Sequence, residues 1–367
     1  MMRSGIKTIC LLQVEFNGFT PLGGAESIAI EVAKGLSDNF QVIILHGVKD
    51  PLKLDEIEYH GDGFYSLASY LHDDDIRYRG EISPELTKKS KEILRCCEVL
   101  ISFERVLKER VAPVNITVLG GTGYLHCGDV VKSKNWDKLI VPSKFVYEWC
   151  VAHEGISREK VIIIHNGINT MELLNGRKEQ RDLKSESLLI PSRPDVKKGF
   201  KESIDLANLL NEKGLKYSVK ILKQKSFISN KSFYSDLEEY SKAKGVNLLY
   251  MDWVSKSNVS SLYNSSKFST MIGEVPEGFG LSVIESIFCG TPVLAKRHGA
   301  VSEVLPPDHG VIFLDEIDLL SMTSVNFENA IEEARMQCLQ YGRKYINDHY
   351  SLKSMINSYI KLVMHEK

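Results

Sequence analysis

The sequence has no long run of apolar residues and no large net charge. Its longest apolar runs, such as Val161 to Ile164, are far shorter than the roughly 20 residues that a membrane-spanning helix needs. We therefore predict no membrane-spanning segment, and residues 1–5 do not form a convincing signal peptide. The 46 basic and 48 acidic side chains give a formal charge of −2, which excludes a large positive field for holding nucleic acid.

The cysteines have no regular arrangement. There are seven, an odd number, and no two of them form a Cys-x-x-Cys pair. This pattern suits reduced thiols better than disulfides or a zinc site. We therefore predict a cytoplasmic protein, and peripheral contact with the inner face of the membrane stays open.

Short apolar runs rich in β-branched residues recur along most of the chain, and they are typical of parallel strands buried on both faces. Between several of them, apolar residues recur at helical spacing, as from Ala25 to Leu36 and from Ile204 to Leu210. Strand and helix in alternation predict βαβ units and an α/β fold. The predicted strands cover residues 8–14, 41–46, 99–103, 115–119, 138–141, 161–164, 188–190, 217–222, 247–253, 268–272, 292–295 and 311–314.

A length of 367 residues suits two domains better than one. Residues 172–186 are polar and lack an apolar period, and about six predicted strands lie on each side of them. We therefore predict a first domain over 1–170, a second over 171–345, and a final helix over 346–367 that crosses back to the first domain. Open parallel sheets bind ligands outside the carboxyl ends of their strands, so the binding residues are expected there.

The most informative motif begins at Glu277 and ends at Glu285, after the predicted strand 268–272. Gly278 and Gly280 allow the backbone to approach a ligand closely, and the helix that follows offers unpaired N–H groups to an anion. Carboxylates on either side of such a turn can accept hydrogen bonds from the vicinal hydroxyls of a sugar or ribose. Taken alone, the glycines would favour an ordinary strand-to-helix turn with two exposed carboxylates.

The same stretch continues into Cys289-Gly-Thr-Pro-Val293 and a small-residue loop that ends at Glu303. This pattern resembles the donor-site signature of the retaining glycosyltransferases with the GT-B fold (glycosyl transferases group 1). In that family, two glutamates separated by seven residues precede a Cys-Gly-x-Pro-Val segment and a small-residue loop ending in Glu. The resemblance extends from Gly23 to the final helix and implies two Rossmann-like parallel-sheet domains facing across a cleft.

By this resemblance, Glu277 contacts hydroxyls of the donor sugar and Glu285 contacts the ribose of the nucleotide. The backbone between them lines the sugar and the diphosphate, through Gly278, Phe279, Gly280 and Leu281. The implied donor is a nucleotide-diphosphate sugar, which is a substrate, so neither a cofactor nor a metal is expected.

A second group of residues follows the predicted strand 188–190. Arg193 and Lys198 lie about five residues apart at the carboxyl edge of the sheet, where a guanidinium and an ammonium can bind a diphosphate. The family has an Arg and a Lys-Gly at these positions, and Lys198-Gly199 matches the latter. Lys197 competes for the same role, and a solvated charged loop is the alternative interpretation.

Three further positions depend mainly on the resemblance. Gly23 and Gly24 match the family's first glycine loop, which implies a backbone N–H bond from Gly24 to the distal phosphate. Many members carry a His after the strand at 116–120; this chain has Leu119-Gly120-Gly121 instead, and His126 is the nearest replacement. The nucleotide base is expected to meet the backbone near Trp253 and Val254.

Other motifs have simpler interpretations. Asp73 and Asp75 form the Asp-x-Asp of metal-dependent single-domain glycosyltransferases, but a solvated acidic loop fits their surroundings better. The basic segment 88–91 reads as a polar helix face, with contact to acidic lipid headgroups as the alternative. Residues 120–123 lack the helix and distal acid of a dinucleotide fingerprint.

The function predicted from the sequence is a metal-independent retaining glycosyltransferase. It would transfer a sugar from a UDP- or GDP-sugar to a sugar or glycolipid hydroxyl in bacterial surface polysaccharide or glycoconjugate synthesis. Arg193, Lys198 and Glu277 would carry the catalysis. The alternatives are a nucleotide-sugar epimerase or phosphorylase of the same fold, or a nucleotide-sugar binding protein without activity.

Overall fold

The computed structural model describes residues 7–17, 24–61, 63–72, 79–133, 135–175, 185–223, 232–252, 254 and 258–365. The chain divides into two compact units. Unit 1 comprises Met1–Gly167 and Leu352–Lys367, and unit 2 comprises Ile168–Ser351. The divisions thus lie at 167/168 and 351/352, against predicted bounds of 170/171 and 345/346. They fall there because Ile168 pairs with Ser351 and its N–H donates to the Tyr350 carbonyl at 2.9 Å.

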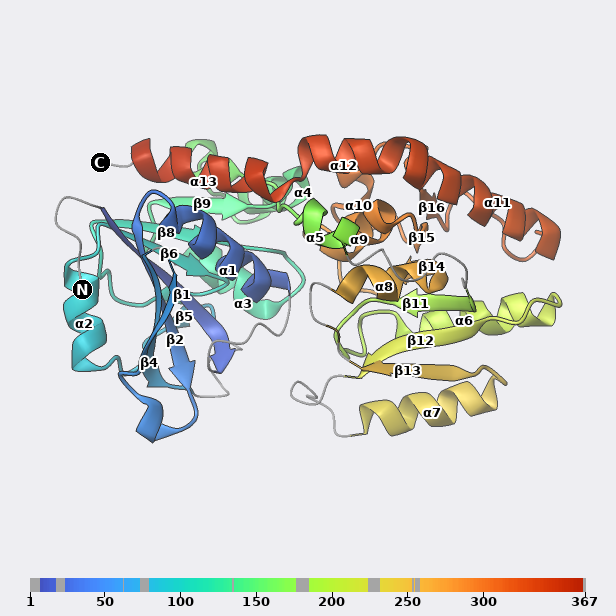
Figure 1. The fold of residues 1–367 in the computed structure, drawn as a ribbon, viewed down its shortest axis with the longest axis horizontal. Coiled ribbons are helices and arrows are strands. Elements are labelled where there is room, and N and C mark those ends of the chain that lie inside the picture. The colour runs from blue at the N-terminus through green and yellow to red at the C-terminus, as the bar shows by residue number, and fades with distance from the viewer. Residues whose placement is uncertain are drawn as a thin grey trace. The chain divides into compact units, whose positions relative to one another are not determined.

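Unit 1 contains a sheet of eight strands among the described residues, in the order β10-β9-β8-β6-β1-β2-β4-β3 (Figure 1). All neighbours are parallel except β3 and β4. The strands are β1 (Thr8–Asn17), β2 (Gln41–Val48), β3 (Ile57–Gly61), β4 (Phe64–Leu71), β6 (Val99–Phe103), β8 (Val114–Val118), β9 (Lys138–Val141) and β10 (Val161–Ile163), with a separate pair of β5 (Glu81–Ile82) and β7 (Val106–Leu107). Every residue of β2, β6 and β8 is buried, as expected of parallel strands covered on both faces.

The helices of unit 1 bury apolar stripes against this sheet. Helix α1 buries six apolar side chains at the predicted spacing, and Gly35 lets it approach α13, because a side chain there would meet Ile356. Lys7 also donates to the Val363 carbonyl at 3.0 Å, so α13 belongs to unit 1. The helices are α1 (Gly24–Ser37), α2 (Lys88–Arg95), α3 (Leu125–Lys132), α4 (Lys144–Glu148) and α13 (Leu352–His365), with short turns η1 (Pro51–Lys53), η3 (Trp149–His153) and η4 (Arg158–Lys160).

Unit 2 contains a sheet of six strands in its described part, in the order β13-β12-β11-β14-β15-β16, and all are parallel. The strands are β11 (Ser185–Ile190), β12 (Ser218–Lys223), β13 (Leu248–Asp252), β14 (Ser266–Met271), β15 (Val293–Ala295) and β16 (Val311–Phe313). All twelve predicted strands of the chain correspond to strands of the two sheets. The α/β fold class with two parallel-sheet domains is therefore confirmed.

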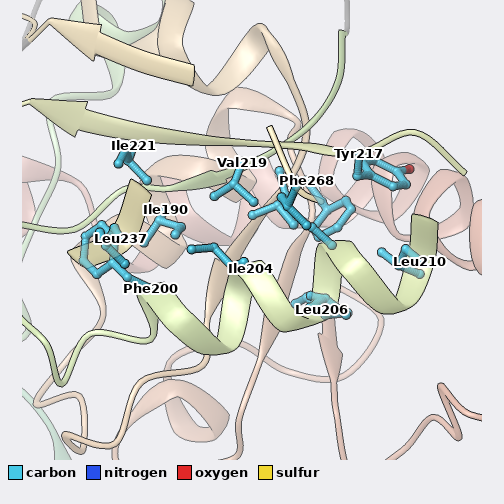
Figure 2. Close-up of a cluster of buried hydrophobic side chains, with 14 of the residues drawn as sticks. Ile190, Phe200, Ile204, Leu206, Leu210, Tyr217, Val219, Ile221, Leu237 and Phe268 are labelled. Atoms are coloured by element: carbon cyan, nitrogen blue, oxygen red, sulfur yellow. The ribbon is translucent and has the colours of Figure 1, made fainter. Parts of the chain in front are cut away.

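The core of unit 2 lies between its sheet and the helix α6. Figure 2 shows Phe200, Ile204 and Leu210 of this helix beside Val219 and Phe268 of the sheet. Tyr217 and Phe268 meet edge to face, with ring centroids 5.3 Å apart. The helices are α5 (Thr170–Asn175), α6 (Phe200–Glu212), α7 (Phe233–Ala243), α8 (Val259–Asn264), α9 (Leu281–Cys289), α10 (Val301–Val304), α11 (Ser324–Gln337) and α12 (Arg343–His349), with the π-helical turn η6 (Cys338–Gly342) before α12.

Strands β3 and β4 lie in a region that the sequence analysis did not resolve into elements, and they form an antiparallel hairpin at the edge of the unit 1 sheet. Within the described residues, no helix is long and apolar enough to cross a membrane.

Candidate donor site in unit 2

Two loops meet at the carboxyl edge of the unit 2 sheet, one after β11 and one after β14. These strands are parallel neighbours, so both loops leave from the same edge. The Glu274 N–H donates to the Lys197 carbonyl at 2.9 Å. A Cβ at Gly199 would lie 2.7 Å from the Gly273 nitrogen, and a Cβ at Gly273 would lie 2.5 Å from the Lys197 oxygen. Glycine at both positions therefore permits the two loops to touch through their backbones.

The two loops also carry opposite charges that meet. Lys198 Nζ lies 2.6 Å from Glu277 Oε1, and both side chains are largely shielded from solvent. The neighbouring Lys197 is exposed. Of the two lysines that the sequence left in competition, Lys198 is the one that the structure brings to Glu277.

The backbone of Glu277 is held in place by the loop that follows β15. Glu277 pairs with Gly299, and the Ala300 N–H donates to the Glu277 carbonyl at 2.8 Å. Gly299 has a φ of 75°, and a Cβ there would lie 2.3 Å from the Glu277 oxygen. A larger residue at 299 would therefore displace the glutamate.

A small pocket opens where these three loops converge. It contains one carboxylate and several groups that are cationic or become so on protonation. Such a balance favours a ligand with more than one negative charge, such as a diphosphate. The lining residues are Lys198, Met271, Gly273, Val275, Glu277, Lys296 and His298.

The glycine turn between the two glutamates leads directly into α9. Gly280 has a φ of 94° at the N-cap of this helix, and its carbonyl accepts from Val283 N–H at 3.0 Å. The N–H groups of Leu281 and Ser282, which precede Val283, have no acceptor within the helix, and this makes the helix start attractive to an anion. Gly290 ends the helix with a φ of 80°, a left-handed conformation that suits glycine.

Phe279 points into the protein rather than toward a ligand. Its side chain is 3% exposed, and its ring meets Tyr350 edge to face with centroids 5.2 Å apart. Any contact that this residue makes with a donor must therefore come from its backbone.

Glu285 lies one helical turn into α9 and has a different partner. The Tyr263 hydroxyl donates to Glu285 Oε2 at 3.0 Å. Burial, followed by the nearby Glu285 charge, raises the pKa of Tyr263 well above its ordinary value, so the phenol stays a donor. Tyr263 thus orients the carboxylate that is predicted to meet the ribose.

The other predicted residues of unit 2 are less closely tied to this pocket. Arg193 is half-buried in the loop after β11, five positions before Lys198. Val254 follows β13, the edge strand that β12 separates from β11. Trp253 lies outside the described residues.

In unit 1, the predicted phosphate loop is described only from Gly24, which is exposed at the start of α1; Gly23 and the Asp73–Asp75 motif lie outside the described residues. His126 lies on α3 with its Nε2 3.7 Å from Glu104 Oε2. Glu104 Oε1 in turn accepts from the Gly120 N–H at 2.6 Å. His126 and Gly120 thus both lie against the Glu104 carboxylate.

Glu104 directly follows β6 and was not identified from the sequence. Its φ of 61° is unusual for a residue with a side chain, and strain of this kind is often found at functional sites. Of the donor-site neighbours, Tyr263 and Lys296 were also missed. The one sequence signal for Glu104 was a carboxylate directly after a predicted buried strand. The sequence gives no such signal for Tyr263, which resembles any other core residue.

One group of side chains in unit 1 has ligand atoms close enough together to hold a metal ion. Among the described residues, Glu104, His126 and Cys127 place these atoms within 4.8 Å of one another. Burial, and then the Glu104 charge, raises the pKa of the Cys127 thiol to about 12. A metal bound by this group would have to displace the thiol proton.

Comparison with known proteins agrees with this geometry. Residues 174–344 match the model of the family described as glycosyl transferases group 1. A Klebsiella pneumoniae protein described as an uncharacterized 41.2 kDa protein in the cps region is 22% identical over 63% of this chain and 62% of its own length. A probable sucrose-phosphate synthase of Thermosipho melanesiensis is 24% identical over 57% of this chain and 48% of its own length. The matched regions thus cover less than two thirds of either relative.

Solved structures match the chain over nearly its whole length. Sucrose-phosphate synthase from Thermosynechococcus elongatus has a TM-score of 0.72 at 14% identity, with 98% of each chain covered. Anabaena HepE in complex with UDP and glucose has a TM-score of 0.71 at 13% identity, with 98% of this chain and all of that chain covered. The family match thus lies within unit 2, and the chain as a whole has the two-domain GT-B fold.

Proposed function

We propose that the chain is a retaining glycosyltransferase that moves a sugar from a nucleotide-diphosphate sugar to a hydroxyl of a sugar or glycolipid. The observation that carries this proposal is the Lys198–Glu277 pair at 2.6 Å, in a pocket that also contains Lys296 and His298. A cation for the diphosphate and a carboxylate for the sugar hydroxyls thus lie side by side. The family match and a structural neighbour that contains UDP and glucose support a UDP-sugar as the donor, with a GDP-sugar as the alternative.

In the proposed complex, the diphosphate takes the place beside Lys198 that Glu277 occupies now. Lys198 and Arg193, with the first N–H groups of α9, neutralise the charge that develops on the leaving phosphate. Glu277 then accepts hydrogen bonds from hydroxyls of the donor sugar, and Glu285 accepts them from the ribose. Gly278, Gly280 and Leu281 contribute backbone groups, as does Phe279, whose side chain is buried.

The proposed chemistry needs no covalent enzyme intermediate. The bond between the anomeric carbon and the phosphate oxygen breaks, and a bond to the acceptor oxygen forms on the same face of the sugar. The acceptor proton passes to the leaving phosphate. The diphosphate charge is met by side chains and N–H groups, so we propose that the reaction is independent of metal.

The remaining proposed contacts come from residues that do not line the unit 2 pocket. His126 would bind a sugar hydroxyl, oriented by Glu104, and Gly23 and Gly24 remain predicted phosphate contacts. Trp253 and Val254 remain predicted contacts of the base. A cytoplasmic location and a role in bacterial surface polysaccharide or glycoconjugate synthesis are part of the proposal; both curated relatives come from bacteria.

A product assay with labelled UDP-glucose tests the function directly. We expect UDP release coupled to a labelled glycoside when a panel of sugar and glycolipid acceptors is supplied. An epimerised nucleotide sugar or a sugar phosphate would instead identify an epimerase or a phosphorylase. Binding of UDP-glucose with no product from any acceptor, and no hydrolysis, would favour a binding protein.

A further inference from the structure

Glu104, His126 and Cys127 bring three different kinds of metal-ligand side chain together in unit 1. Within the described residues, their carboxylate oxygen, imidazole nitrogen and thiol sulfur lie within 4.8 Å of one another. Cys127 is fully buried, and the side chains of Glu104 and His126 are only 15% and 12% exposed. Carboxylate, imidazole and thiolate are the ligands that Zn²⁺ takes in proteins, so the group has the right chemistry for this ion.

The gap between Glu104 and His126 suits a metal better than a hydrogen bond. His126 Nε2 lies 3.7 Å from Glu104 Oε2, which is too long for a hydrogen bond. Two ligand atoms on one tetrahedral zinc ion, with bonds of about 2.0–2.2 Å, lie roughly 3.3–3.6 Å apart. His126 Nε2 is also buried and has no hydrogen-bond partner in the described part of the chain. A bound zinc ion would give this nitrogen the partner that it lacks.

The carboxylate of Glu104 is held in position by the backbone around it. Glu104 has a φ of 61°, and its N–H donates to the Val118 carbonyl at 2.8 Å. Its Oε1 accepts from the Gly120 N–H at 2.6 Å, and a Cβ at Gly120 would lie only 2.5 Å from that oxygen. Glycine at 120 therefore leaves room for the carboxylate, and the second oxygen, Oε2, faces His126.

His126 and Cys127 lie in the first turn of α3, and Tyr124 helps to orient both. The His126 ring stacks on the Tyr124 ring, with centroids 5.8 Å apart and planes 11° apart. The Cys127 N–H donates to the Tyr124 carbonyl at 3.1 Å. Two of the three ligands are thus oriented by one residue, and the third by the backbone after β6. Ligands that are positioned in advance lose little freedom when they bind an ion.

The charges of the group suit a divalent ion once the thiol has lost its proton. Burial, and then the Glu104 charge, raises the pKa of Cys127 to about 12, so the thiol keeps its proton when no metal is bound. Zinc binding would release this proton to solvent, and the carboxylate and thiolate would together neutralise the ion. The Arg105 guanidinium, which donates to the Glu104 carbonyl at 2.7 Å, opposes a cation here. The direct bonds between the ion and its ligands must outweigh that repulsion.

We propose that Glu104, His126 and Cys127 bind one Zn²⁺ ion, with a water molecule as the fourth ligand. The ion would join the end of β6 to α3 and so stabilise unit 1. Zinc bound through Nε2 leaves the other ring nitrogen of His126 for the proposed contact with a sugar hydroxyl. The zinc site is compatible with metal-independent transfer, because its ligands are none of the groups proposed to neutralise the diphosphate. It holds whether or not the proposed transfer is correct.

Titration of the metal-free full chain with Co²⁺ tests the ligands, since Co²⁺ bound to a thiolate shows a charge-transfer band in the near ultraviolet. We expect the band to saturate at one Co²⁺ per chain and to disappear when one equivalent of Zn²⁺ is added. Cys127→Ser should abolish the band. Cys150→Ser is the matched control, because Cys150 is a second buried thiol of unit 1 near Cys127, and it should keep the band.

Three outcomes of the titration would overturn the proposal. They are the absence of the band from the wild-type chain, its persistence in Cys127→Ser, which would indicate an adventitious thiol site only, and its equal loss in Cys150→Ser. His126→Gln should weaken zinc binding by about 10-fold or more. This variant changes a less buried position and decides the matter if Cys127→Ser fails to fold; unchanged zinc affinity would exclude His126 as a ligand.

Thermal denaturation tests the stabilising role and needs no nucleotide sugar, so its result is independent of the proposed transfer. Zinc at 100 times its dissociation constant should raise the Tm of the wild-type chain by about 3–10 °C. Glu104→Gln should lose most of this shift, although its amide oxygen can still accept from the Gly120 N–H. Glu109→Gln, at an exposed glutamate of the same unit, is the control and should keep the shift. No shift in the wild-type chain, or an equal shift in Glu104→Gln, would contradict the zinc site.

Discussion

The carboxyl edges of the two sheets are built differently. In unit 2, three loops converge on one ion pair, and glycines at 199, 273 and 299 let their backbones touch. In unit 1, the polar groups next to Gly120 come from single residues, Glu104 after β6 and His126 on α3. The difference suggests that unit 2 presents a rigid, backbone-based site, while the polar contacts of unit 1 rest on individual side chains.

Of the substitutions that test the two sheet edges, Lys198→Ala should lower turnover the most. Loss of this cation removes stabilisation of the leaving diphosphate, so we expect turnover with UDP-glucose to fall by about 10²–10³-fold. Lys197→Ala is the matched control, since this neighbour is exposed, and it should change turnover by less than about threefold. Similar losses in both variants would mean that Lys198 has no special role.

Gly299→Ala should test how rigidly Glu277 is held. The added Cβ would lie 2.3 Å from the Glu277 carbonyl oxygen, and alanine would have to keep the left-handed backbone of Gly299. Together these two effects should lower the free energy of unfolding by about 2–5 kcal/mol. Gly245→Ala is the control, because Gly245 has a φ of 66° and nothing within 4 Å of an added Cβ. Gly245→Ala should lower the free energy of unfolding by only about 1–2 kcal/mol. Scanning calorimetry measures both, and equal destabilisation would show that the loops adapt to one another.

In unit 1, His126→Ala should lower the sugar-transfer rate about 10-fold, the usual worth of one hydrogen bond to a sugar hydroxyl. The affinity for UDP should not change, because the proposed nucleotide contacts lie in unit 2. Isothermal titration with UDP and a rate assay measure the two quantities separately. His153→Ala, an exposed histidine of the same unit, is the control. A matching loss of UDP affinity would contradict the division of roles between the units.

The smallest effect is expected from removal of metal. Preincubation with EDTA should change turnover by less than twofold if Lys198, Arg193 and the α9 N–H groups meet the diphosphate charge. Glu104, His126 and Cys127 are the described residues through which a metal would most readily act. Activity that EDTA abolishes and one added metal restores would contradict metal independence, and loss of that restoration in Cys127→Ser would place the metal in unit 1.

The sequence predicted the parts of the fold that depend on local pattern. All twelve predicted strands are present because buried parallel strands leave continuous apolar runs, as in β6 and β8. The hairpin of β3 and β4 was missed because its outer strand has no fully buried residue and so no continuous apolar run, although Gly61-Asp-Gly63 between the strands is a turn signal. Such an edge strand has a much weaker pattern than a central one.

For the candidate site, the sequence indicated several of the residues involved. It did not indicate which of them contact one another. The motif from Glu277 to Glu285 was visible because glycines and carboxylates stand at fixed positions after a strand. The pairing of Lys198 with Glu277, rather than of Lys197, depends on how two distant loops meet, and no local pattern encodes it. Tyr263 was invisible for the opposite reason, since a buried tyrosine on α8 resembles any other core residue.

The burial of Phe279 against Tyr350 bears on attempts to engineer this protein. The residue in the middle of the glycine turn would attract mutagenesis as an obvious specificity position, yet its side chain belongs to the packing of unit 2. A library randomised at 279 would be enriched in chains that fail to fold, and the survivors would keep the same donor preference. A change of donor would have to be sought among residues whose side chains line the pocket, beginning with Val275 and His298.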